Sequence, residues 1–105
     1  MGATLSFQTL RVLAALLRQP EAYGLEIASE AGLKSGSLYP ILHRLEAIGW
    51  ISGRREEIDE AAAGRRRRCY YKLTEVGRGE AFGLLGAARE ALRPSRNRQG
   101  RAVGT

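Results

Sequence analysis

The change between helical and strand-like periodicity over residues 23–73 constrains the fold more than any other feature of the chain. Apolar side chains recur at helical spacing in residues 23–31 and 37–48, with a short turn between them. Residues 50–57 and 68–73 are predicted as strands, and four consecutive arginines lead into the second. Two helices, a tight turn and a basic hairpin in this order predict a mainly α fold with a small β hairpin, the winged helix-turn-helix.

Residue types at the helix ends support this order of elements. Residues 5–17 have the spacing of an amphipathic first helix, which Thr4 or Ser6 can cap and which ends before Pro20. Gly32 follows the second helix at the position where a left-handed C-terminal cap is favoured. The first three helices are therefore predicted to form one three-helix core.

The third helix, over residues 37–48, carries its apolar side chains on one arc. Its predicted core residues are Leu38, Ile41, Leu42, Leu45 and Ile48. Pro40 fits a helix if Ser37 is the N-cap, because Pro40 is then the third helical residue and its missing N–H costs no intrahelical bond. The proline is thus predicted to mark the start of the helix.

The wing is predicted from two strands and the loop that joins them. Residues 59–64 are small or acidic, which predicts a flexible connection. In the second strand Cys69, Tyr71 and Leu73 share one face, and the polar residues between them share the other. The apolar face is expected to pack on the core.

Three regions follow from these patterns. Residues 1–74 form the predicted winged helix-turn-helix, and residues 75–93 form a C-terminal dimerisation helix that Thr74 caps. Residues 94–105 are basic and have almost nothing apolar to bury, which predicts a disordered tail. A domain this small buries little surface alone, so a homodimer is expected.

Composition excludes several classes of protein. The chain has 17 Lys and Arg against 11 Asp and Glu, a net charge of +6, which favours a polyanionic partner. Its single cysteine, Cys69, excludes an internal disulfide and a multi-cysteine zinc site and fits a reducing compartment. There is no membrane-spanning run, no signal pattern, and no nucleophile with a base or phosphate-cradling loop. A cytoplasmic protein that is not an enzyme, with no cofactor and no metal, is expected.

Three motifs resemble the PadR family of bacterial transcription regulators. They are YGLEI at residues 23–27, GSLYPILHRLEAIGWI at residues 36–51, and YYKLT at residues 70–74 followed by Gly77 and Arg78. The resemblance covers about residues 9–78. It implies a winged helix-turn-helix with a C-terminal dimerisation helix, and ligand-responsive repression of nearby genes. The short C-terminal part is similar to the smaller members, which have one helix after the wing.

The arc of the third helix opposite its core residues is the surface available to a DNA major groove. With the preceding turn it supplies seven candidate DNA contacts: Lys34, Ser35, Ser37, Tyr39, Pro40, His43 and Arg44. Ser35 and Ser37 lie where hydroxyls, free N–H groups and the helix dipole favour a phosphate. Tyr39 can donate its hydroxyl to a phosphate while its ring braces the turn, or it can simply cover the helix junction.

The other candidates of this surface also have two interpretations. His43 can reach a base edge or a phosphate, or it can be an inert surface histidine. Arg44 can contact a phosphate or a guanine, or it can pair with Glu46 in solvent. Lys34, in the turn, is expected to contact a phosphate.

The arginine run is the stronger electrostatic signal. Arg65, Arg66, Arg67 and Arg68 repel one another, and at a hairpin tip they are best explained by phosphate contacts or by insertion into a minor groove. The alternative is a solvated loop neutralised by acids of the opposite limb, which are Glu56, Glu57, Asp59 and Glu60.

The last helix carries more apolar surface than one small domain needs. The residues predicted to pair two copies are Leu5, Phe82, Leu84, Leu85, Ala88 and Leu92. Pairing would place two recognition helices about one DNA turn apart, which predicts a palindromic double-stranded operator.

The signal for a sensor is weaker than the signal for DNA binding. The resemblance implies a flat aromatic effector at the dimer centre, but Phe82 is the only aromatic residue of the last helix. Cys69 can be a small apolar core residue or a thiol sensor flanked by arginines. The competing hypothesis for the whole chain is a winged-helix protein-interaction module, an adaptor or antirepressor without direct DNA binding.

Overall fold

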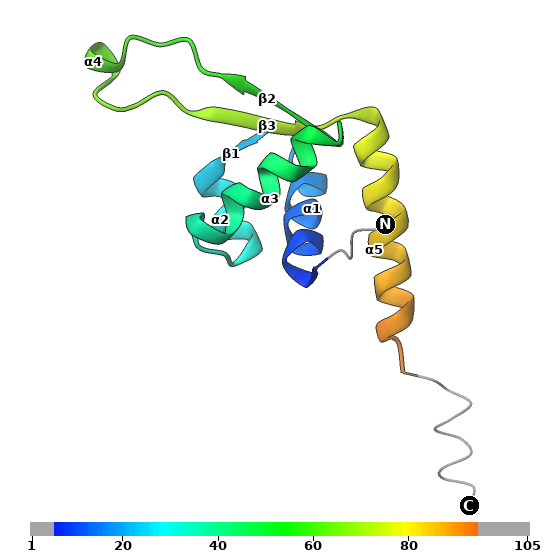
Figure 1. Ribbon diagram of the computed structural model, residues 1–105. Helices are drawn as coiled ribbons and strands as arrows, with labels where there is room; N and C mark the ends of the chain where they lie inside the picture. Colours follow the sequence, from blue (N-terminus) through cyan, green and yellow to red (C-terminus); the bar gives the residue numbers. More distant parts are fainter. Residues whose placement is uncertain (1–5, 95–105) are drawn as a thin grey trace, which may run out of the picture.

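The structure, a computed structural model, describes residues 6–94 and contains the expected mainly helical fold with a small antiparallel sheet. The elements are α1 (Phe7–Arg18), β1 (Ala22–Tyr23), α2 (Gly24–Ala31), α3 (Ser35–Ala47), β2 (Ile51–Arg55), α4 (Glu60–Ala63), β3 (Cys69–Leu73) and α5 (Glu75–Leu92). Figure 1 shows α1, α2 and α3 grouped together, the wing extending to one side and α5 to the other. Leu5 and the predicted tail, apart from Pro94, lie outside the described residues.

The core lies between the first three helices and the inner face of the sheet. The largest fully buried side chains are Leu13, Leu16, Ile27, Leu38, Leu42 and Val12. Ser6 caps α1, as predicted, by accepting a hydrogen bond from the Thr9 amide at 3.1 Å. The amphipathic pattern of the sequence therefore places these helices correctly.

Two apolar residues of the helical patterns, Leu25 and Ile48, are exposed, and Ile48 was predicted to lie in the core. Leu25 is 67% exposed because it lies about 100° around α2 from Gly24, away from the buried face that Ile27 and Ala28 share. Ile48 is 57% exposed because α3 ends at Ala47 and Ile48 is its C-cap, with ψ at 4°.

The third helix begins earlier than predicted. Its N-cap is Lys34, not Ser37, because the Lys34 carbonyl accepts from the amides of both Ser37 and Leu38 at 3.0 Å. With Ser35 as the first helical residue, Pro40 is the sixth and lies inside the helix. The bond that Pro40 cannot donate would reach the carbonyl of Gly36, and Gly36 is an exposed residue.

The sheet has three strands in the order β1-β3-β2, where the sequence predicted a two-stranded wing. The additional strand, β1, is only two residues long, and its Tyr23 pairs with Tyr70 of β3. Tyr71 and Leu73 are buried, as their alternation predicted, and Cys69 is half-buried against the core.

The end of the wing is a short helix and not the flexible loop predicted for residues 59–64. Asp59 caps α4 by accepting from the amides of Ala61 and Ala62, and Gly64 ends it with φ at 72°. Figure 1 shows α4 at the far end of the wing. The arginines that follow Gly64 therefore lie on the returning limb and not at the tip, as had been expected.

Helix α5 begins at the predicted cap and leaves the core along its length. Thr74 accepts a hydrogen bond from the Gly77 amide at 3.0 Å, and Ala81 is completely buried. Farther along, Leu84 and Leu85 are half-buried against the core. None of the helices in the described part of the chain has the length and apolar character needed to cross a membrane.

Candidate nucleic-acid interface

The outward face of α3 is continuous and open. The seven candidates from Lys34 to Arg44 are all exposed, because the opposite arc of the helix takes up the packing contacts. Within residues 6–94, no hydrogen bond or ion pair involves the side chain of His43 or Arg44, so the alternative pairing of Arg44 with Glu46 is not formed. These two side chains are available to a ligand outside the chain.

Tyr39 covers the junction between α2 and α3 and remains partly exposed. Its ring packs against the start of α2 so closely that a Cβ atom on Gly24 would overlap its hydroxyl group. The side chain is nevertheless 43% exposed. Tyr39 therefore braces the junction between the two helices and is still partly accessible to solvent.

The start of α3 offers backbone donors beside two hydroxyl groups. Ser35 and Ser37 both lie in the first turn, which contains no acidic residue. The amides of Ser35 and Gly36 precede the first intrahelical bond, and they lie at the positive end of the helix dipole. With Lys34 directly before them, these groups form a surface suited to an anion.

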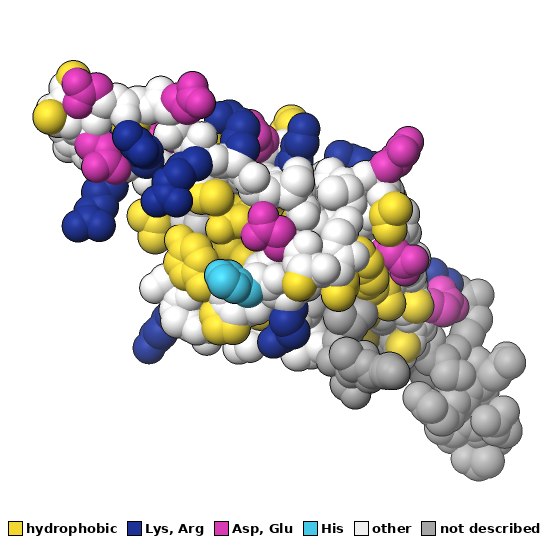
Figure 2. Space-filling model, turned by 45° about the horizontal axis from the view of Figure 1, so that its top comes forward, with side chains coloured by type: hydrophobic (Ala, Val, Ile, Leu, Met, Phe, Trp, Pro, Cys, Tyr) yellow, Lys and Arg dark blue, Asp and Glu magenta, His cyan; other side chains and the backbone are white. Residues whose placement is uncertain are grey.

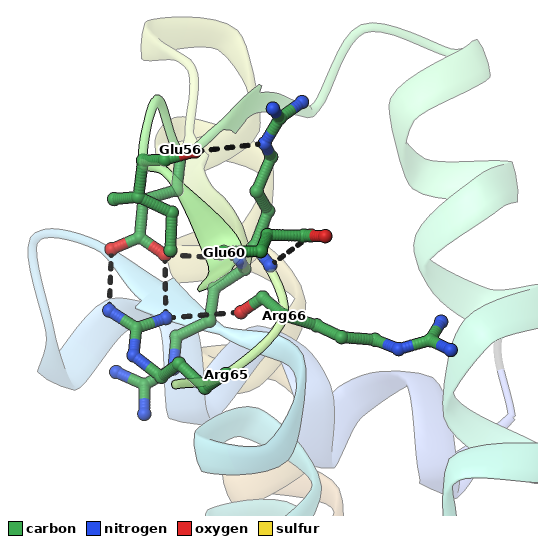
Figure 3. A network of polar contacts seen from close by, with 7 residues as sticks. Glu56, Glu60, Arg65 and Arg66 are labelled. Carbon is green, nitrogen blue, oxygen red and sulfur yellow. Dashed lines mark hydrogen bonds and ion pairs between the residues drawn. The ribbon is translucent and has the colours of Figure 1, made fainter. Parts of the chain in front are cut away.

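Arg65 is held by an acid from the opposite limb of the wing. Its Nη1 and Nη2 atoms donate to Oε1 and Oε2 of Glu56 at 2.8 and 2.9 Å (Figure 3). The Glu56 side chain is only 16% exposed and that of Arg65 36%. Hydrogen bonds from Arg65, with a further one from the Arg68 amide, lower the pKa of Glu56 to about 2 despite its partial desolvation. The same pair raises the pKa of Arg65.

The other three arginines differ in what they contact. The Arg68 guanidinium lies over the ring of Tyr23, 4.2 Å from its centroid. The Arg67 amide donates to Glu60 Oε2 at 2.7 Å, and the Nε atom of the Arg67 side chain donates to the Ile58 carbonyl at 3.4 Å. The side chain of Arg66 has no hydrogen bond or ion pair within the described residues, and Figure 3 shows it extending away from the network.

The outer face of the sheet carries an aromatic and cationic stack that the sequence did not reveal. The rings of Tyr23 and Tyr70 meet edge to face at 5.7 Å. Arg54 lies 5.0 Å from the centroid of Tyr70 and donates two hydrogen bonds to Glu21, at 2.9 and 3.0 Å. The stack depends on pairing between β1 and β3, and a two-residue strand leaves no periodic signal in the sequence.

Basic side chains of the wing lie next to the outward surface of α3. Figure 2 shows them gathered beside the apolar surface that carries the only histidine of the chain, with acidic side chains at the far end of the wing. The structure therefore brings the two predicted DNA-contacting regions to one face.

The residues predicted to pair two copies fall into two groups. Phe82 and Leu92 are 65% and 71% exposed. Leu84 and Leu85 already pack partly against their own core, Ala88 is half-buried, and Leu5 lies outside the described residues. In residues 6–94 there is no cluster of three His, Cys, Asp or Glu side chains that could hold a metal ion.

Residues 12–81 match a known family, described as the transcriptional regulator PadR-like family. A search of curated proteins gave no match. Among solved structures, the chain is similar to a PadR family transcription regulator from Clostridium difficile, with a TM-score of 0.68 and 26% identity over 82% of this chain and 91% of that one.

Two further structures extend the comparison. The transcriptional regulator PA4135 has a TM-score of 0.64 and 29% identity, over 82% of this chain and 59% of its own length. BpsR of Bordetella bronchiseptica, whose DNA binding is regulated by 6-hydroxynicotinic acid, has a TM-score of 0.70 over 94% of this chain and 74% of its own. At 15% identity, BpsR shows only the shared fold. A MarR family transcriptional regulator from Silicibacter pomeroyi is also similar in structure. The chain spans 56% of the length of that regulator and 59% of the length of PA4135.

Proposed function

The chain belongs to the PadR-like family of transcriptional regulators, and from this premise we propose that it is a homodimeric repressor that binds double-stranded DNA. The observation that carries the proposal is the open outward face of α3, with His43 and Arg44 free of partners within the described residues. The basic wing lies on the same side of the molecule. A helix that enters the major groove beside a basic hairpin is the arrangement that winged helices use on DNA.

Helix α3 and the wing would contact different parts of the DNA. His43 and Arg44 reach base edges in the major groove, where donor and acceptor patterns distinguish base pairs. Lys34 and the first turn of α3 contact phosphates, and Arg66 and Arg67 on the wing contact the flanking backbone or the minor groove. Phosphate contacts of this kind make binding weaken steeply with salt.

A second copy would join through α5. Phe82 and Leu92 expose large apolar side chains on this helix, and pairing would remove them from water. Two-fold pairing presents two recognition helices to DNA, so the operator is proposed to be palindromic.

We further propose that a small aromatic effector releases the repressor from DNA. The support for this proposal is the family membership and the regulation of BpsR, a protein of the same fold, by 6-hydroxynicotinic acid. The effector would bind between the two copies near Phe82, where it could favour a spacing of the recognition helices that no longer fits the operator.

The proposal is tested by fluorescence anisotropy with labelled DNA from upstream of the chain's own gene and a scrambled duplex as control. The wild-type protein should prefer the upstream DNA, and its affinity should fall as salt rises. Arg66→Ala with Arg67→Ala should weaken binding to both duplexes, whereas His43→Ala should reduce the preference between them. Absence of salt-dependent binding, together with capture of a protein partner, would instead favour the interaction-module hypothesis.

A further inference from the structure

The wing contains four consecutive arginines, but its acidic residues bind some of them and leave the side chain of another without a partner in the described residues. The amides of Arg67 and Arg68 and the guanidinium of Arg65 all donate to carboxylates of Glu56 or Glu60. Only the side chain of Arg66 points away without a partner in the described part of the chain (Figure 3). The loop therefore has an internal order that a row of repelling charges would not adopt by itself.

Glu56 is the centre of this order. Its Oε1 accepts from Arg65 Nη1 at 2.8 Å and from the Arg68 amide at 3.1 Å, and its Oε2 accepts from Arg65 Nη2 at 2.9 Å. The backbone adds a fourth bond, from the Glu56 amide to the Arg68 carbonyl at 2.8 Å. A side chain that is 84% buried and bound on both oxygens is a fixed part of the fold and not a mobile counter-charge.

We propose that Glu56 is a positioning residue of the DNA-binding wing, which keeps Arg65 from contacting DNA and presents Arg66 to it. The inference rests on the DNA binding proposed above. Both Nη atoms of Arg65 already donate to Glu56, which holds this guanidinium against the wing and neutralises its charge, whereas Arg66 can reach a phosphate without breaking any bond in the described structure. The Arg66 carbonyl accepts a further hydrogen bond from Arg65 Nη1 at 3.2 Å, which connects the backbone of Arg66 to the network.

The consequence is discrimination between sequences. Four mobile arginines would contact phosphates of any duplex and so raise the affinity for all DNA. An arginine on an ordered loop, such as Arg66, loses less conformational freedom on binding, and it meets the duplex at one fixed position. Glu56 therefore lowers general affinity and raises the ratio of operator binding to non-specific binding.

The matched test compares Glu56→Gln with Glu57→Gln. Both remove one negative charge from neighbouring wing positions, but Glu57 is exposed and has no hydrogen bond in the described residues. In Glu56→Gln, the freed Arg65 should steepen the slope of log K against log salt by about 0.9, the value for one added phosphate contact. The ratio of operator to scrambled-DNA affinity should fall by about 2- to 10-fold, because an Arg66 that is no longer held in position must lose more conformational freedom when it reaches its place on the operator.

The control and a second variant separate positioning from simple charge. Glu57→Gln should strengthen binding to both duplexes alike and leave their ratio unchanged. In the Glu56→Gln background, Arg65→Gln should return the salt slope to its wild-type value, because the additional contact is then removed. Thermal unfolding followed by circular dichroism should show that all variants remain folded.

Amide hydrogen exchange measures, without DNA, whether Glu56 orders the wing. The Arg68 amide should exchange faster in Glu56→Gln than in Glu57→Gln, because only the first change weakens its acceptor. Equal salt slopes and equal ratios for the two variants, with wild-type DNA binding intact, would overturn the role of Glu56 alone. A wild-type protein that binds no DNA would overturn the proposed function and this inference together.

Discussion

The backbone of Gly77 lies directly against the carbonyl group of Trp50, and a Cβ atom at Gly77 would overlap that oxygen. The contact fixes the first turn of α5 against the start of the wing. We expect Gly77→Ala to destabilise the protein by about 1–3 kcal/mol, because the backbone must shift to admit the methyl group. Gly36→Ala is the control, since a Cβ there meets nothing within 4 Å. Urea unfolding followed by circular dichroism measures both, and equal midpoints would contradict the contact.

The neighbouring Thr74 hydroxyl makes two hydrogen bonds at the same junction. It donates to the Gly49 carbonyl at 2.7 Å and accepts from the Gly77 amide at 3.0 Å. Thr74→Val keeps the shape but removes both bonds, so we expect a loss of about 0.5–2 kcal/mol in the free energy of unfolding. Thr74→Ser retains the hydroxyl group and should lose much less. A valine variant as stable as the serine variant would show that the cap contributes little.

The sequence predicted those elements whose residues repeat a period. Leu38, Ile41 and Leu42 recur at helical spacing, so the buried face of α3 and its open opposite face could both be derived. Strand β1 could not be predicted, because two residues show no alternation and Tyr23 is defined as strand only by its distant partner Tyr70. Helix α4 is a single turn, too short for a periodic pattern.

The internal order of the wing depended on tertiary placement. The arginines and the opposing acids could be identified in the sequence, but their partners could not be assigned. Pairing of β2 with β3 brings Glu56 opposite Arg68 and near Arg65, and α4 carries Glu60 to the amide of Arg67. Because α4 was not predicted, the arginines were wrongly placed at the tip of a flexible loop.

The ion pair between Glu56 and Arg65 should respond to acid in a defined range. The pKa of Glu56 is lowered to about 2 from the usual 4.5, so its ionised form is the one favoured by folding. Its stabilising contribution is fully present above about pH 4.5 and is lost as the pH falls through about 2. Carbon NMR of the Glu56 carboxyl group should follow this titration. In Arg65→Gln its midpoint should rise towards 4.5, and an unchanged midpoint would exclude Arg65 as the main cause.

Tyr39 offers a test of whether its hydroxyl acts on DNA or only covers the helix junction. No partner for this hydroxyl exists within the described residues, and Tyr39 is 43% exposed. Tyr39→Phe should weaken binding to operator and scrambled DNA alike by about 3–10-fold, the effect of one lost hydrogen bond. The melting temperature should change little, because the ring remains against α2. Wild-type affinity in this variant would restrict Tyr39 to its structural role.

Pairing of two copies through α5 predicts a large effect of charge at Phe82. This side chain is 65% exposed on the helix proposed to meet the second copy, so a carboxylate there would be buried without a partner on association. Phe82→Glu should convert a dimer to a monomer in sedimentation equilibrium and weaken binding to a palindromic duplex more than to a single half-site. Leu25→Glu is the matched control, because Leu25 is 67% exposed on α2, away from that helix. If both variants have the same mass as the wild type, Phe82 is not in the interface; if Leu25→Glu alone is monomeric, the second copy binds at α2 instead.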